Sequence, residues 1–271
     1  MLGASFCPLD AQITTPLLVQ RLAQASAEQG ATILEHTRVR GVIESGGDVC
    51  GVTIDTGSIE ADVVVLAAGV WTRALAATAG VDLPIGGERL QVMATHPLPM
   101  QVQPLVYGPL ATKQYSLFRD LPSWRREDFT VAYESEQGIE MLQLLAQRPT
   151  GEILLGCPMD YPSEIDDRPT LDGVAAITEM IGQDFPGLRS APIDRVWAGV
   201  LPYTADLAPV IDEVVPGLVV AAGHVFGNAA GPVTGRIVSQ LIRGAEPQID
   251  ISECRFDRAL EQVGGGAPTR W

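Results

Sequence analysis

The 271-residue sequence has few cysteines, and no two of them lie close together in the chain. The four are Cys7, Cys50, Cys157 and Cys254. Without a CxxC pair, the sequence gives no support to a zinc site or to a redox-active cysteine pair. A disulfide framework is not expected in a chain of this length, so the cysteine content favours a reducing compartment, and we expect a cytoplasmic location.

Long apolar runs and positive charge are also scarce. The longest continuous apolar stretch covers residues 63–68, which is too short to span a bilayer, so no transmembrane segment is predicted. The first residues have neither a basic region nor a long apolar run, and therefore do not resemble a signal peptide. Lys and Arg number 18 against 33 Asp and Glu, which gives a net charge of −15. An acidic surface repels phosphate backbones and anionic lipid heads, so no nucleic acid or membrane-surface partner is expected.

A third absence is the GxGxxG fingerprint of dinucleotide binding, which occurs nowhere in the sequence. The remaining composition is ordinary for a globular protein. Hydrophobic residues make up 46% and charged residues 19%, which leaves enough apolar material for a core. The length suits two interleaved domains.

Secondary-structure patterns change twice along the chain. The expected elements of the first part are helices at 16–29 and 71–79, strands at 31–35, 38–44 and 49–55 with a turn at 45–48, and a β-branched strand at 63–69 of the kind that is buried on both faces. The middle part is predicted to contain short strands at 89–95, 129–133, 141–147 and 152–156 and one helix at 171–181. A buried strand at 217–223 and a helix at 232–242 follow. This order predicts one α/β domain interrupted by a mostly antiparallel, β-rich insertion.

Two segments can border a ligand through small residues or a turn. Residues 61–71 form a strand that ends in Ala67, Ala68 and Gly69, where a flat ligand or another backbone can approach closely. Residues 195–206 contain a tryptophan, a glycine and a Pro/Thr/Asp turn that can line an aromatic cavity. A simple strand followed by a turn explains each segment as well, so both interpretations stay open.

A third segment, residues 217–236, combines a strand, a glycine-rich loop and a helix. Gly223, Gly227 and Gly231 leave backbone N–H groups free to face a ligand, and a helix that starts at Pro232 adds a positive dipole end. A tight strand-to-helix turn is the alternative. Three glycines are more than one turn needs, which favours the approach of a ligand.

Taken in order, these segments resemble the FAD-dependent D-amino acid oxidase, glycine oxidase and sarcosine oxidase family. The resemblance covers residues 8–251. It rests on Thr37-Arg38-Val39, on Val-Val-Leu-Ala-Ala-Gly-Val-Trp ending at Trp71, on Trp-Ala-Gly-x-x-Pro-x-Thr-x-Asp from Trp197, and on Ala-Ala-Gly-His before Gly-Pro-x-Thr-Gly-Arg. It implies a partial, Rossmann-like FAD-binding domain at 10–84 and 197–250, a β-rich substrate domain at 85–196 and a disordered tail at 261–271.

The resemblance also implies where FAD binds. The adenine end would lie against the backbone at Val39, the first strand end and Trp71 would flank the cofactor, and the loop after Gly223 would wrap the pyrimidine side of the flavin. The helix from Pro232 would point its N-terminus at the flavin N1–C2=O edge, where negative charge gathers on reduction. The implied cofactor-binding residues are Val39, Ala67, Ala68, Gly69, Trp71, Gly223, His224, Val225, Phe226, Gly227, Asn228, Ala229 and Ala230. The implied activity is hydride transfer to the flavin from a carbon next to nitrogen in an amino acid or secondary amine.

The sequence departs from the family in three ways. Because no GxGxxG occurs, we expect this chain alone to bind FAD weakly or not at all. Leu201 stands where oxidases of the family carry an arginine that holds the substrate carboxylate. The arginines Arg89, Arg119 and Arg125 are expected to be solvated surface charges. No cysteine lies near residues 197–206, so FAD is expected to be non-covalent.

Several assignments stay open at this point. Leu201, Tyr203 and Phe226 are weak candidates for substrate contacts, and no catalytic residue or metal ligand is assigned. His224 is expected to bond either the cofactor or nearby backbone. Leu201 favours the heteromeric dehydrogenases of the family, which pass electrons to partner subunits. A cofactor-free structural or regulatory subunit is the alternative, and a nicotinamide-dependent enzyme agrees less well with the missing fingerprints.

Overall fold

The computed structural model describes residues 3–110, 118, 120–129 and 138–258. The chain forms two units, Met1–Arg38 and Val39–Trp271. In the first unit, α1 (Thr15–Glu28) confirms the predicted helix, with a proline in its first turn and Gly30 at a φ of 98° after its end. The predicted strand at 31–35 is wrong: these residues form coil and the start of a turn. A strand needs a neighbour to bond its backbone, and the described part of this unit offers none.

The second unit begins with a small antiparallel sheet of β1 (Val39–Ser45), β2 (Asp48–Ile54) and β3 (Gly57–Glu60). The predicted hairpin between β1 and β2 is confirmed. Gly46 and Gly47, both at positive φ, turn the chain between the two strands.

A second sheet joins distant parts of the chain in the order β10-β11-β4. Its strands are β4 (Val64–Leu66), β10 (Val210–Val215) and β11 (Leu218–Ala222). β4 and β11 run parallel, with Leu218 beside Val64 and Val220 beside Leu66. The chain thus returns to the sheet that contains β4 after about 150 residues.

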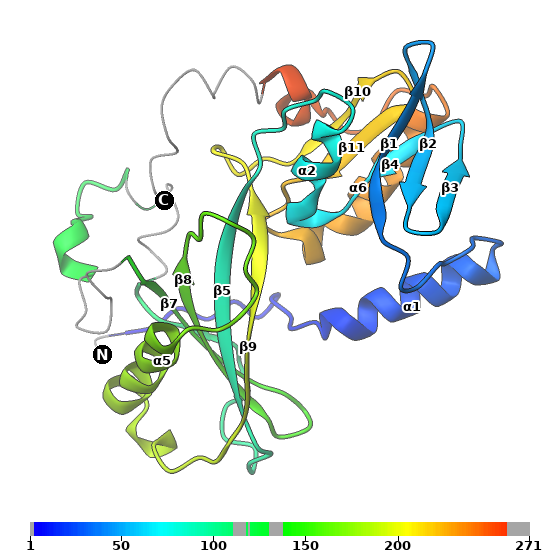
Figure 1. Ribbon diagram of the computed structural model, residues 1–271. Helices are drawn as coiled ribbons and strands as arrows, with labels where there is room; N and C mark the ends of the chain where they lie inside the picture. Colours follow the sequence, from blue (N-terminus) through cyan, green and yellow to red (C-terminus); the bar gives the residue numbers. More distant parts are fainter. Residues whose placement is uncertain (1–2, 111–117, 119, 130–137, 259–271) are drawn as a thin grey trace. The chain divides into compact units, whose positions relative to one another are not determined.

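Helices cover this sheet unevenly (Figure 1). α6 (Gly227–Ile242) packs against β10 and β11, and α2 (Thr72–Ala77) packs against β4 from the other side. The predicted two-sided burial is right for β11, whose Leu218, Val219 and Val220 are all buried. It is wrong for β4, where Val65 keeps 37% of its surface exposed, because β4 is the edge strand of the described sheet and α6 packs against its neighbours.

Two helix starts differ from the prediction. The segment expected as a helix at 71–79 is a 3₁₀ turn, η1 (Gly69–Trp71), followed by the short α2. α6 begins at Gly227 rather than at Pro232, because the carbonyl of Phe226 already accepts the N–H groups of Ala229 and Ala230. Pro232 therefore lies inside the helix, where it leaves one backbone carbonyl without its usual donor.

The third sheet is antiparallel, in the order β6-β7-β8-β5-β9. Its strands are β5 (Gly86–Thr95), β6 (Val106–Tyr107), β7 (Glu140–Gln147), β8 (Ile153–Asp160) and β9 (Ile193–Tyr203). α5 (Leu171–Asp184) lies against one face, where Ile177 and Met180 join Met93 and Leu155 in a buried core (Figure 1). Thr170 is the N-cap residue of α5, and its side-chain hydroxyl accepts a hydrogen bond from the N–H of Gly173.

Three of the four predicted middle strands are confirmed as β5, β7 and β8, as is the helix at 171–181. Short 3₁₀ turns are η2 (Arg126–Phe129), η3 (Pro186–Leu188) and η4 (Ser252–Cys254). Phe129 belongs to η2, and the rest of the strand expected at 129–133 lies outside the described residues, as does the tail at 261–271. The predicted α/β fold class with an antiparallel β-rich part is confirmed.

Searched over the described residues, the structure has no helix long and apolar enough to cross a membrane. The same part of the chain contains no group of three or more His, Cys, Asp or Glu side chains arranged to hold a metal ion.

Candidate functional site

The structure brings the first and third candidate segments together at one edge of a sheet. β4 and β11 are parallel neighbours in register, so both carboxyl ends point the same way. Ala67, Ala68 and Gly69 follow β4 directly, and Gly223 and His224 follow β11. The carboxyl ends of parallel strands are where ligands bind in open α/β sheets.

The turn of the second segment packs against the same edge. Gly223 has a φ of 82°, and a Cβ built there would lie 3.1 Å from Cγ2 of Thr204. Thr204 is buried, and its hydroxyl lies 2.6 Å from the Ala208 carbonyl and 2.9 Å from Asp206. Thr204 and Asp206 therefore shape the turn, and Gly223 is required by both its backbone and its close neighbour.

Two other glycines of this segment are not required by the fold. Gly227 and Gly231 lie in the first turns of α6 at helical φ, and a Cβ at Gly231 would meet nothing within 4 Å. A Cβ at Gly227 would meet only the Cβ of His224, at an ordinary 3.6 Å. The N–H groups of Ala229 and Ala230 already donate to the carbonyl of Phe226, so those of Gly227 and Asn228 are the donors that this helix start leaves without a partner within the helix. The space beside this helix start is thus open to a ligand.

His224 turns toward the helix. One of its ring nitrogens, Nε2, lies 2.8 Å from the hydroxyl of Thr234, which is buried in α6. Burial lowers the pKa of His224, so the neutral imidazole is favoured at pH 7. The side-chain partner Thr234 is neither of the two partners expected from the sequence.

The other predicted cofactor residues differ in their settings. Trp71 and Phe226 are more than half exposed, and Val225 is partly buried. Val39 pairs with Ile54 at the start of β1, on a different sheet from the strand ends that carry Gly69 and Gly223.

The predicted substrate candidates of β9 lie on the antiparallel sheet. Leu201 pairs directly with Glu88, and Tyr203 pairs with Gly86. Directly opposed residues of antiparallel strands point to the same face, so Leu201, Tyr203 and Glu88 share one face of the sheet. The first segment packs against the opposite face of these strands, since a Cβ at Gly87, next to Glu88, would contact both Val200 of β9 and Val70 of η1.

Glu88 is a candidate that the sequence pattern did not reveal. It is 4% exposed, and its Oε1 accepts a hydrogen bond of 2.9 Å from the hydroxyl of Tyr161. Burial raises the pKa of Glu88 to about 7, against the lowering effect of the Tyr161 bond. The strand was expected to begin at residue 89, so Glu88 fell just outside it; a carboxylate between two glycines and an arginine gives no sign of burial.

The prediction that Arg89 is a solvated surface charge is wrong. Arg89 is buried rather than solvated, with Nε 2.8 Å from Asp160 Oδ1 and a second bond from Nη2 to Oδ2. The hydrogen bonds to Asp160 raise the pKa of Arg89 further. Its guanidinium lies on the α5 side of the sheet, opposite to Glu88, because adjacent strand residues face opposite ways. Arg125 is exposed as expected, and Arg119 lies outside the described residues.

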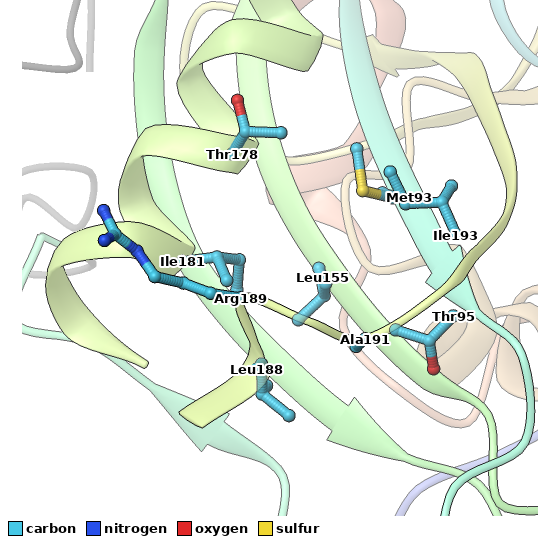
Figure 2. Close-up of a pocket in the computed structure, with 9 residues that line it drawn as sticks. All are labelled: Met93, Thr95, Leu155, Thr178, Ile181, Leu188, Arg189, Ala191 and Ile193. Atoms are coloured by element: carbon cyan, nitrogen blue, oxygen red, sulfur yellow. The ribbon is translucent and has the colours of Figure 1, made fainter. Parts of the chain in front are cut away.

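A cavity of about 330 Å³ lies on the α5 side of the same sheet (Figure 2). Its lining is mainly apolar, and the guanidinium of Arg189 is directed away from the other lining side chains. The lining residues are Met93, Thr95, Leu155, Thr178, Ile181, Leu188, Arg189, Ala191 and Ile193. None of them is a predicted site residue, so this cavity is separate from the strand ends described above.

Comparison with known proteins agrees with this arrangement. The chain is 28% identical over 270 residues to glycine oxidase of Geobacillus kaustophilus, which covers 97% of the chain and 62% of that protein. It is 25% identical over 248 residues to the hydrogen cyanide synthase subunit HcnC of Pseudomonas aeruginosa, covering 90% of the chain and 52% of that subunit. The crystal structure of the Geobacillus kaustophilus glycine oxidase aligns with a TM-score of 0.73 at 23% identity, over 92% of the chain and 59% of that structure.

The chain thus spans about three fifths of the length of the first curated relatives that it matches. Residues 1–241 match the family described as DAO, FAD dependent oxidoreductase. The segments that meet at the ends of β4 and β11 fall within the matched residues, and the chain belongs to the DAO family of FAD-dependent oxidoreductases.

Proposed function

We propose that this chain is part of an FAD-dependent enzyme that oxidises the CH–NH bond of an amine or amino acid by hydride transfer to flavin. The supporting observation is the edge where β4 and β11 end. There a Cβ at Gly69 would meet nothing within 4 Å, and α6 presents the N–H groups of Gly227 and Asn228 at its start. Positive dipole ends of this kind stabilise negative charge.

The residues present fit an FAD molecule at this edge. Glycine at 227 and 231 is unnecessary for α6, so the space that side chains would fill there is available to a flat ring. The proposed contacts are Val39, Ala67, Ala68, Gly69, Trp71 and residues 223–230. Bound FAD would supply the hydride acceptor. The helix start would hold the edge of the ring that becomes negative, and the exposed Trp71 and Phe226 would shield it from water.

Several finer points belong to the same proposal. We propose FAD-binding segments at 10–84 and 197–250 around a substrate domain at 85–196, and a non-covalent cofactor, since no cysteine lies within residues 197–206. Because the sequence lacks GxGxxG, this chain alone is proposed to hold FAD weakly. Partner subunits are proposed as electron acceptors, which the similarity to a subunit of hydrogen cyanide synthase supports. The scattered cysteines support a reducing, cytoplasmic location.

The experiment is an absorption spectrum of the purified chain after incubation with FAD and desalting, together with an FAD titration followed by flavin fluorescence. Saturable binding, with flavin lost on desalting, is the expected result. Absence of any saturable binding would favour the second candidate, a cofactor-free structural or regulatory subunit, which the missing fingerprint motivates.

A further inference from the structure

One face of the antiparallel sheet places a single buried carboxylate among aromatic and aliphatic side chains. Oε1 of Glu88, in β5, accepts a hydrogen bond of 2.9 Å from the hydroxyl of Tyr161. Tyr161 directly follows β8, the strand on one side of β5. Leu201 of β9 lies opposite Glu88 on the other side. Tyr161 and Tyr203 meet edge to face, with ring centroids 6.0 Å apart. We call Glu88, Tyr161, Leu201 and Tyr203 the Glu88 face.

Positive charge is kept away from the Glu88 face. Within the described residues, no Lys, Arg or His forms an ion pair with Glu88, and the neighbouring Arg89 is bound to Asp160 on the opposite side of the sheet. The ionisable groups that interact electrostatically with Glu88 are Glu140, Cys157, Tyr161 and Tyr203. All four are neutral or negative at neutral pH, so the face has no cationic group of its own among the described residues.

This combination suits a ligand that brings its own positive charge. A carboxylate attracts an ammonium group, and the rings of two tyrosines add cation–π attraction to it. Leu201, Tyr161 and Tyr203 are each partly exposed, so the face is open to solvent while Glu88 lies at its base. A ligand carboxylate at this place would meet the charge of Glu88 without an arginine to hold it.

We propose that the Glu88 face binds the ammonium group of the substrate, so that the substrate is a cationic amine with no carboxylate beside the bound nitrogen. Naming the ligand as the substrate rests on the function proposed above. Within that function, the inference separates this protein from an enzyme for simple α-amino acids and gives Glu88 a role in specificity.

The test uses tetramethylammonium, whose charge does not change with pH, and measures its binding to the full 271-residue chain by calorimetry at pH 8. Saturable binding is expected. Glu88→Gln keeps an oxygen for the Tyr161 hydroxyl but removes the charge, and it is expected to weaken binding at least tenfold. The matched control Glu179→Gln removes an exposed carboxylate from α5, on the other side of the sheet, and is expected to leave binding unchanged.

A pH series sharpens the assignment. Because burial raises the pKa of Glu88 to about 7, binding of tetramethylammonium is expected to weaken about tenfold per pH unit below 7 and to level off above it. Burial likewise raises the pKa of Cys157 to about 12 and raises those of Tyr161 and Tyr203, so these groups stay neutral over this range. Binding that does not change between pH 5 and 8 would overturn the role of Glu88.

A second variant keeps the inference testable if Glu88→Gln does not fold. Leu201→Arg places a cation opposite Glu88 at a partly exposed position, where it neutralises the Glu88 carboxylate, and it is expected to abolish tetramethylammonium binding. Unchanged tetramethylammonium binding in this variant would overturn the inference. FAD titration of the same proteins separates the two proposals. FAD binding without tetramethylammonium binding would contradict this inference alone. Tetramethylammonium binding without FAD binding would contradict the proposed function.

Discussion

Leu201 of β9 and Glu88 of β5 face each other across two antiparallel strands, on the side of the sheet away from α5. Leu201 was selected from the sequence as the place where an arginine is missing. Its partner in the sheet is a buried carboxylate. This part of the sheet therefore carries negative charge where oxidases of the family carry the positive charge of an arginine. The stability of the fold should therefore depend on pH through Glu88.

Glu88→Gln is predicted to stabilise the protein at high pH. The folded state raises the pKa of Glu88 from 4.5 to about 7, so it binds the proton more tightly than the unfolded chain does. The stability that this proton provides is complete below pH 4.5 and is lost as the pH rises to about 7. The variant should thus match the native chain at pH 4.5 and exceed it at pH 8 by about 3 kcal/mol in free energy of unfolding. Urea unfolding at both pH values measures this, and an equal difference at the two would contradict it.

Arg89→Leu is predicted to destabilise the chain by about 3 kcal/mol, because it leaves Asp160 without its partner in a mostly buried setting. The matched control is Arg40→Leu, whose partner Asp55 is half exposed, as is Arg40 itself. Removal of this surface pair should cost less than about 1 kcal/mol. Comparable losses in the two variants, measured by urea unfolding, would show that the Arg89 pair is as solvated as the sequence suggested.

Gly223→Ala and Gly231→Ala are predicted to act in opposite directions. Alanine at 223 must adopt a φ of 82° with its Cβ 3.1 Å from Thr204, at a cost of about 2 kcal/mol. Alanine at 231 meets nothing within 4 Å and sits in a helix, so it should stabilise the chain by up to about 1 kcal/mol. Thermal unfolding of both variants provides the comparison. If Gly223→Ala stabilised the chain, residue 223 would not adopt a positive φ in contact with Thr204.

Local patterns predicted most of the fold, and long-range contacts account for the rest. The β1–β2 hairpin, α5 and β11 follow from alternation, helical periodicity and turn residues within short stretches. The strand expected at 31–35 has no neighbouring strand among the described residues. A local sequence pattern cannot show whether such a neighbour exists. Arg89 is buried by Asp160, a residue 71 positions further along the chain, so its setting could not be predicted from nearby residues.

The candidate site shows the same division. The small residues after β4 and the glycines after β11 were visible in the sequence. The resemblance implied that both segments border the cofactor, and the parallel pairing that places them at one edge was not predicted. The start of α6 was misplaced because Pro232 was taken as a first-turn residue. The Glu88 face was missed because its members come from β5, from β9 and from the residue after β8, and the register of these strands decides which side chains meet.

The central claim is that the start of α6 holds the flavin, and one FAD titration tests it most directly. Gly231→Leu fills open space beside the helix start, and Gly235→Leu, one turn further along α6 and equally unobstructed, is its control. Fluorescence titration is predicted to show at least tenfold weaker FAD binding for Gly231→Leu and native binding for Gly235→Leu. Native FAD binding by both variants would contradict the account.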